Sequence, residues 1–298
     1  MNNIQKLNMQ IENSHISITP LQNLNLSDDF LFDVTTEDLE ACKIIIELSL
    51  GITIKEIRWK EGQKVLHNLP GKRGIRLDFY VEDIENNIFN VEMQKRNQGN
   101  IPKRTRFYQG LVDSPLLKTG ERGFDSLNPL YIIIICDFDL FGLGKYRYTF
   151  TNRCHEEQNL ELGDGSVKII LNTHGSNDSE VEQSLVDFLH YVADSSCSSL
   201  PDECDDRLIH LHNKVTQIKA SEHMEVAYMK MEERDRLIQE HGEEIGLQKG
   251  LIQGKSAAMY SFIDANRKDH LTDVEIHAML QKYFRLTPEE ADELLSQV

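Results

Sequence analysis

Hydrophobic and polar positions along the chain predict an alternation of helices and short strands in its first half. Apolar residues recur at helical spacing from Leu39 to Leu50, and Gly51 then suits a helix end. Three short runs rich in β-branched and aromatic residues follow, and a fourth comes after the next helix. The four predicted strands are Ile54–Trp59, Arg76–Glu82, Ile88–Gln94 and Leu130–Cys136.

The connections between these elements indicate a fold class. Residues 82–87 are typical of a hairpin loop, so the first three strands are expected to be antiparallel neighbours. A helical pattern runs from Ile101 to about Leu117, with Pro102 in its first turn. The order of helix, three strands, helix and strand predicts an α/β fold in which helices flank a mixed central sheet.

The second half of the chain is predicted to be mainly helical. Helical patterns cover Ser179–Val192 and Pro201–Glu240, and two short ones lie within residues 272–295. Glycine recurs every four residues from Gly242 to Gly254. That spacing suits a helix that packs closely against a copy of itself, and it also suits a flexible linker. The first alternative makes a homodimer through the C-terminal region a candidate assembly.

These patterns divide the chain into four parts. A polar lead-in of residues 1–26 precedes an α/β core of residues 27–175. Residues 176–240 are a helical region that packs on or extends the core, and residues 241–298 hold the glycine-spaced segment and a small helical unit. This division fits the length of the chain, because single cores seldom exceed about 250 residues.

Charge and composition limit the classes of function. The formal net charge is −17, so most of the surface repels a phosphate polyanion and any contact with DNA must use a local basic patch. The five cysteines form no CxxC pair, which favours a reducing cytoplasm over a disulfide framework or a zinc knuckle. No apolar run approaches the roughly 20 residues that cross a membrane, so no membrane partner is expected.

Polar side chains interrupt two of the predicted strands. Asp78 lies in the otherwise apolar second strand, while Glu92 and Gln94 leave one face of the third strand. A buried carboxylate needs a partner, and a divalent cation is one candidate; the alternative is a pair of strand-edge carboxylates that face water. Two carboxylates and the backbone carbonyl of Met93 suit Mg²⁺, which prefers oxygen ligands. Such an ion polarises a phosphoryl oxygen and activates water, which is the chemistry of phosphodiester hydrolysis.

Three stretches of the chain resemble a known family in the same order. They read "GKRGIRLDFYVED", "NIFNVEMQKRNQ" and "IPKRTRFYQGLVDSPLLKTGERGFDSLNPLYIIIICDFDLF". Residues 27–153, together with Gly242–Gly254, are similar to the PD-(D/E)xK nuclease family transposases, which are relatives of the Rpn recombination-promoting nucleases. The resemblance implies a restriction-endonuclease-like core that cuts DNA with Mg²⁺, for which Mn²⁺ can substitute.

The resemblance also implies roles for individual residues. Asp78 and Glu92 take the two acidic positions, and Gln94 takes the third motif position. Lysine is usual there in the wider superfamily; glutamine can hydrogen-bond water but supplies no positive charge. A basic cluster beside these residues, which also includes Lys103, favours phosphate binding over an ordinary solvated helix face, because the rest of the chain is acidic. The residues assigned to phosphate contact are Arg104, Tyr108, Lys95, Arg96 and Arg106.

One further acidic residue and the choice between functions remain open. Related nuclease cores often carry an acidic residue near the metal on the helix that here holds Glu47, although a solvent-facing glutamate is the simpler interpretation. The main functional expectation is a DNA endonuclease associated with recombination, mobile elements or phage defence. The missing lysine favours an alternative, a catalytically degenerate nuclease fold that acts as a protein-interaction or regulatory module. A true transposase would need strand-transfer chemistry that the sequence does not reveal.

Overall fold

The computed structural model describes residues 19–66, 75–117, 123–125, 127–196 and 200–297. The chain divides into two compact units, Met1–Tyr228 and Met229–Val298. The boundary between the two units lies inside one long helix, whereas the last part expected from the sequence starts at residue 241, with the glycine-spaced segment.

The described end of the expected lead-in belongs to the core of the first unit. A short 3-10 helix spans Leu21–Asn23, and the side chains of Leu21, Leu24 and Leu26 are buried. The backbone N–H of Leu26 donates to the Ser195 hydroxyl at 2.8 Å, so this segment is fixed to a distant part of the chain. Residues 1–18 of the lead-in lie outside the described residues.

Two helices precede the sheet. Helix α2 spans Asp29–Thr35, and helix α3 spans Leu39–Leu50. The Asp38 side chain accepts a hydrogen bond from the Ala41 N–H at 2.9 Å and so caps the start of α3. Gly51 ends α3 with a φ of 68°, a left-handed conformation that glycine adopts without strain. Both ends of the predicted helix are confirmed.

The first unit contains a mixed six-stranded sheet with strand order β1-β2-β3-β4-β6-β5. The β1–β2 and β2–β3 pairs are antiparallel, as the hairpin pattern predicted, and β5 is antiparallel to β6. The β3–β4 and β4–β6 pairs are parallel. The predicted α/β fold of the restriction-endonuclease type, with a mixed sheet and flanking helices, is confirmed. The strands are β1 Ile57–Leu66, β2 Ile75–Asp83, β3 Ile88–Gln94, β4 Leu130–Cys136, β5 Arg147–Phe150 and β6 Ser166–Asn172.

The strand pattern differs from the expectation in two ways. Strand β1 begins at Ile57 and continues to Leu66, beyond the apolar run that predicted it, because its pairing with β2 supports a polar stretch. Strands β5 and β6 were not predicted. Strand β5 is only four residues long and partly exposed, so it carries almost no hydrophobic signal.

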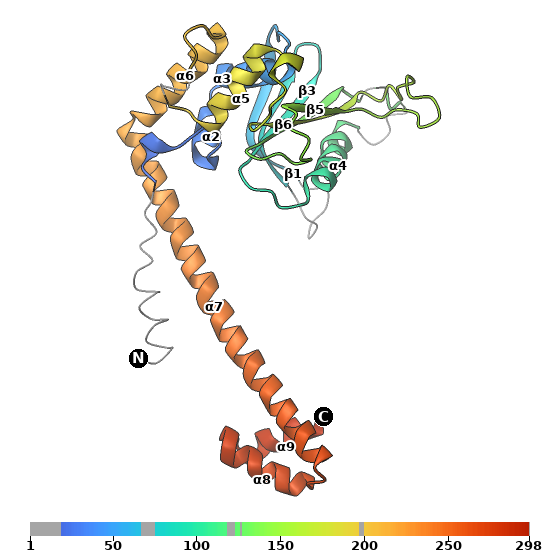
Figure 1. Ribbon diagram of the computed structural model, residues 1–298, viewed down its shortest axis with the longest axis vertical. Helices are drawn as coiled ribbons and strands as arrows, with labels where there is room; N and C mark the ends of the chain where they lie inside the picture. The colour runs from blue at the N-terminus through green and yellow to red at the C-terminus, as the bar shows by residue number, and fades with distance from the viewer. Residues whose placement is uncertain (1–18, 67–74, 118–122, 126, 197–199, 298) are drawn as a thin grey trace. The chain divides into compact units, whose positions relative to one another are not determined.

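Helices cover the two faces of the sheet (Figure 1). Helix α4, Ile101–Asp113, lies on one face and is followed by a 3-10 turn at Ser114–Leu116. Helices α2, α3 and α5, Gln183–Ala193, lie on the other face. Under α4 the buried side chains of the sheet form an apolar cluster that includes Tyr80, Ile88, Tyr108, Ile132 and Ile134. This cluster forms the floor of the site described below.

The remaining helices are α6, Asp206–Lys219, and α7, Glu222–Lys268, after a short 3-10 helix at Asp178–Glu180. The predicted helical stretch Pro201–Glu240 is therefore interrupted near Ala220. The four glycines of Gly242–Gly254 lie inside α7, so the linker interpretation is wrong. Helix α7 extends well beyond this segment on both sides, and these flanking turns can carry glycines that each cost about 1 kcal/mol relative to alanine.

A small helical core closes the second unit. Helices α8, Asp273–Phe284, and α9, Pro288–Ser296, each begin with a capping box, at Thr272 and Thr287. Ile263 of α7 packs with side chains of both helices in a buried cluster with Ile276, Leu280 and Ala291. The two short helices expected within residues 272–295 are confirmed.

Glu47 is a structural residue of the first unit. Its side chain is buried, so the expectation of a solvent-facing glutamate is wrong. One carboxylate oxygen accepts the N–H of Ile54 at 2.7 Å, and the other lies 3.6 Å from the guanidinium of Arg207 on α6. The carboxylate thus connects the end of α3 to the segment that leads into β1.

We predict that Glu47→Ala lowers the free energy of unfolding by about 1–3 kcal/mol, because the buried N–H of Ile54 loses its acceptor. Urea denaturation of the full chain measures this change. Glu85→Ala is the control: Glu85 pairs with Lys55 at an exposed position, where an ion pair contributes at most about 1 kcal/mol. Equal stability of the Glu47 variant and the wild type would contradict the assignment.

Candidate functional site

The sheet brings Asp78 and Glu92 together. Phe79 of β2 pairs with Val91 of β3 in the antiparallel ladder, and continuing that register by one residue places Asp78 opposite Glu92. Directly opposite residues project from the same face, so both carboxylates point to the α4 side. Asp78 also accepts the N–H of Met93 at 2.9 Å, which holds its carboxylate against β3.

Arg104 on α4 completes the arrangement. Its guanidinium donates to Glu92 at 2.8 Å, to the side-chain oxygen of Gln94 at 2.7 Å and to the Tyr108 hydroxyl at 2.9 Å. The Gln94 amide in turn donates to the Met93 carbonyl at 2.7 Å. Arg104 therefore links the two polar residues of β3 to α4, and a planar guanidinium suits such simultaneous contacts.

Burial governs the electrostatics of the two carboxyls. Burial and the charge of nearby Asp78 together raise the pKa of Glu92 to about 8, although Arg104 opposes the shift. Burial likewise raises the pKa of Asp78 to about 7, against the hydrogen bond from Met93. Neither carboxyl is fully ionised near neutral pH in the absence of a cation. Groups with such shifted pKa values gather at functional sites.

Two acidic residues of α2 that the sequence reasoning missed act on the same site. The charges of Asp33 and Asp29 both raise the pKa of Asp78. Burial raises the pKa of Asp29 itself, and Lys95 and Arg96 oppose that shift. Their spacing of four residues on a short helix was the available signal, since such residues share one helix face.

The donor set fits a hard divalent cation. One oxygen of Glu92, Oε1, is buried and has no hydrogen-bond partner among the described residues, so it is an acceptor in need of a positive partner. The carboxylate of Asp78 and the carbonyl of Met93 lie beside it, and oxygen ligands of this kind suit Mg²⁺. Among the described residues, no group of three His, Cys, Asp or Glu side chains is placed to hold a metal, so protein carboxylates alone do not enclose an ion here.

The predicted phosphate-binding residues occupy different environments. Arg104 keeps 23% of its side chain exposed, so a ligand can reach it, whereas Tyr108 is buried and acts through its hydrogen bonds with Arg104. Lys95 forms an ion pair with Asp28 at the start of α2. Exposed basic side chains complete the region, namely Arg96, Lys103 and Arg106.

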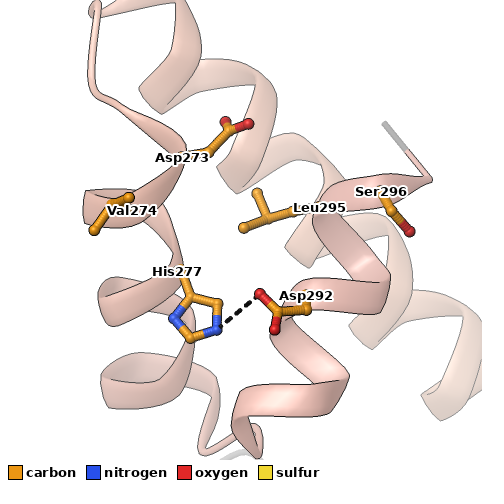
Figure 2. A pocket seen from close by; sticks show the side chains of 6 residues that line it. All are labelled: Asp273, Val274, His277, Asp292, Leu295 and Ser296. Atoms are coloured by element: carbon orange, nitrogen blue, oxygen red, sulfur yellow. Dashed lines mark ion pairs between the residues drawn. The ribbon is translucent and has the colours of Figure 1, made fainter.

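The second unit offers a different kind of feature. A pocket between α8 and α9 is lined by Asp273, Val274, His277, Asp292, Leu295 and Ser296 (Figure 2). Nε2 of His277 lies 3.3 Å from Asp292 and 3.2 Å from the carbonyl of Pro288, so this ring nitrogen is already engaged. None of the predicted site residues lies in this unit. No helix in the described part of the chain is long and apolar enough to span a membrane.

The comparison with known protein families agrees with this site. Residues 49–184 match the family model described as "PD-(D/E)XK nuclease family transposase". No curated protein and no solved structure matches the chain. The matched range contains all six strands and α4, and therefore Asp78, Glu92, Gln94 and Arg104. Over residues 49–184 the chain is thus similar to the PD-(D/E)XK nuclease family transposases, and this match supports a nuclease-type function for that part of the chain.

Proposed function

We propose that the protein is a Mg²⁺-dependent DNA endonuclease associated with recombination, mobile elements or phage defence. The observation that carries the proposal is the pairing of the half-buried Asp78 with the buried Glu92 on one sheet face, with an unpaired Glu92 oxygen and with Arg104 beside it. Like-charged carboxyls are costly to bury next to each other, and a divalent cation offsets that cost. The match to a nuclease family supplies the reaction class.

Asp78, Glu92 and the carbonyl of Met93 are the proposed metal ligands. When bound, Mg²⁺ supplies an acidic water and stabilises charge on the phosphate, and Mn²⁺ serves in the same way. The Met93 carbonyl would offer the ion its second lone pair, because the first accepts the Gln94 amide hydrogen. Asp78 keeps its bond from the Met93 N–H, which orients its carboxylate.

Gln94 and Arg104 together take the two roles of the lysine found elsewhere in the superfamily, which are to orient water and to supply positive charge. The Gln94 side chain donates one amide hydrogen to the Met93 carbonyl, and its oxygen accepts one hydrogen bond from Arg104. One amide hydrogen and one oxygen lone pair are left to orient an attacking water. Arg104 supplies the positive charge that glutamine lacks, and it contacts the phosphate of the substrate. Tyr108 positions Arg104 by accepting two of its hydrogen bonds.

The proposed DNA-binding surface extends from Arg104 over the exposed basic residues Arg96, Lys103 and Arg106. Lys95 joins it when DNA phosphate competes with Asp28 for its ammonium group. The overall charge of −17 opposes non-specific adhesion to DNA, so binding is weak and decreases strongly with salt.

A degenerate nuclease fold that acts as an interaction or regulatory module is the alternative. Gln94 in place of lysine is the observation that favours it. An interaction module would tolerate the loss of the carboxylates of Asp78 and Glu92, because they would have no metal to bind. The cleavage experiment below therefore separates the two functions.

The proposal includes a homodimer formed through α7. Ile238, Ile245 and Ile252 are spaced by seven residues and are 63%, 38% and 66% exposed, which leaves an apolar row along the helix. The glycines from Gly242 to Gly254 have no described atoms within 4 Å of where a Cβ would stand, so a second helix can approach closely. Exposed apolar rows of this kind typically mark an interaction surface.

The proposed site of action is a reducing cytoplasm. The cysteines that the structure describes, Cys42, Cys136, Cys154 and Cys204, are free thiols, two of them buried. Free buried thiols are common in proteins of reducing compartments.

We predict that the purified protein nicks or cuts supercoiled plasmid with Mg²⁺ or Mn²⁺ and not with EDTA. Asp78→Ala and Glu92→Ala are each expected to reduce the rate by at least about a hundredfold, because each removes a ligand that holds charge at the reacting phosphate. Glu85→Ala, in the exposed hairpin, is the matched control and keeps wild-type activity. Absence of metal-dependent cleavage by folded wild-type protein would favour the interaction module.

We predict that metal affinity increases with pH up to about 8. Protons compete with the cation for Glu92, whose pKa is about 8, and for Asp78, whose pKa is about 7. The dissociation constant for Mn²⁺, measured by calorimetry, should therefore be at least about tenfold larger at pH 6 than at pH 8.5.

The same raised pKa values have the opposite effect on the ion-free fold. Carboxyls that bind protons more tightly in the folded state than in the unfolded chain lower the free energy of unfolding as pH rises from about 4 to about 8. Metal affinity that did not change between pH 6 and pH 8.5 would contradict the assignment of these two ligands.

We predict that the full-length chain is a dimer in size-exclusion chromatography with light scattering at micromolar concentration. Replacing Ile245 and Ile252 together by glutamate should give the monomer mass, since charge is unfavourable in an apolar helix contact. Val274→Glu is the control, because Val274 is 81% exposed and lies on α8, outside the proposed contact along α7. A wild-type chain with monomer mass would refute the proposed assembly.

A further inference from the structure

Asn90 is an unusual residue for the middle of a buried strand. It lies on β3 two residues before Glu92, so both side chains project from the same face of the sheet. Its neighbours in the ladders are Tyr80 on β2 and Ile132 on β4, and both belong to the apolar cluster under α4. A primary amide with no exposed surface is thus enclosed by apolar side chains.

The polar atoms of this amide are unsatisfied within the described protein. Neither Oδ1 nor Nδ2 of Asn90 has a hydrogen-bond partner, and the same holds for Oε1 of Glu92. Three buried polar atoms without partners thus lie within two residues on one strand face. Buried groups of this kind cost stability, so an apolar side chain at position 90 would give a more stable ion-free fold. Such local costs are expected mainly at functional sites.

The two side chains are complementary in chemistry. Asn90 offers amide hydrogens and a carbonyl acceptor, whereas an ionised Glu92 offers only acceptors. One water can accept from Nδ2 and donate one hydrogen to Oδ1 of the same amide, while its second hydrogen goes to Oε1 of Glu92. A single water therefore satisfies all three atoms, and a buried water needs two to four such partners.

We propose that Asn90 is a positioning residue for Glu92, which it holds through one buried water so that the carboxylate is oriented to bind metal. The inference rests on the proposed metal-binding role of Glu92. Asn90 does not touch the ion or the substrate. Partners that hydrogen-bond to a metal ligand orient it and stabilise its charge, and their loss typically weakens metal affinity by about 10–100-fold.

The test combines metal affinity with stability in the absence of metal. Calorimetry with Mn²⁺ on the full chain should show a dissociation constant about 10–100-fold larger for Asn90→Leu than for wild type. The melting temperature of Asn90→Leu in EDTA should equal or exceed that of wild type, because leucine suits the surrounding apolar cluster and does not require an immobilised water. Asn90→Thr keeps a hydroxyl that can bind the water, so its metal affinity should lie between the two.

Ile132→Val is the matched control, since Ile132 is the ladder neighbour of Asn90 in the same apolar layer. It should lower the melting temperature and leave Mn²⁺ affinity unchanged. Unchanged Mn²⁺ affinity in Asn90→Leu would overturn the role of Asn90 and leave the proposed function standing. The same conclusion would follow if Asn90→Leu failed to fold, or if it melted in EDTA below the temperature of Ile132→Val. If wild type binds no Mn²⁺, the proposed function and this inference both fail.

Discussion

The site depends on the burial of two carboxyls next to each other on one sheet face. Asp78 and Glu92 stand opposite each other in adjacent strands, beside the apolar cluster under α4. Burial of this kind disfavours two negative charges, which is why both pKa values are raised toward neutrality. Arg104 offsets part of the cost for Glu92. In the proposed function, a bound cation recovers the stability that is lost to the remaining cost.

The fold holds this unfavourable pair in place through its strand pairing. Antiparallel pairing of β2 with β3 sets the two carboxyls opposite each other, and parallel pairing of β3 with β4 places Glu92 in the centre of the sheet. Helix α4 then brings Arg104 over the same face. Rigid sheet and helix positions matter here, because a metal or water site tolerates errors of only about 0.5 Å in its ligands.

The sequence predicted those parts of the site that depend on strand periodicity. Asp78, Glu92 and Gln94 interrupt apolar strands that a hairpin joins, so their approach could be inferred before the fold was known. The inference for these three residues uses only spacing within strands, where side-chain direction follows from residue number. The expectation for Arg104 came instead from the resemblance to the nuclease family, and its guanidinium hydrogen-bonds to Glu92 and Gln94.

Features that depend on tertiary packing were not predictable in the same way. Glu47 was expected to face solvent, because neither partner of its carboxylate can be inferred from helical spacing. Ile54 follows after the end of α3, and Arg207 lies far along the chain on α6. Nothing in the sequence distinguished Asn90 from other strand residues. The energetic cost of burying its amide without partners is evident only once the cluster under α4 is known. Asp29 was overlooked because a helix of seven residues gives a weak periodic signal.

The most direct test of a metal site between Asp78 and Glu92 is a crystal structure of the full chain grown with Mn²⁺ at pH 8.5, with anomalous diffraction recorded. The account predicts an anomalous peak within about 2.5 Å of the carboxylates of Asp78 and Glu92 and of the Met93 carbonyl. A peak at other residues only, or no peak in crystals of folded protein saturated with Mn²⁺, would contradict it.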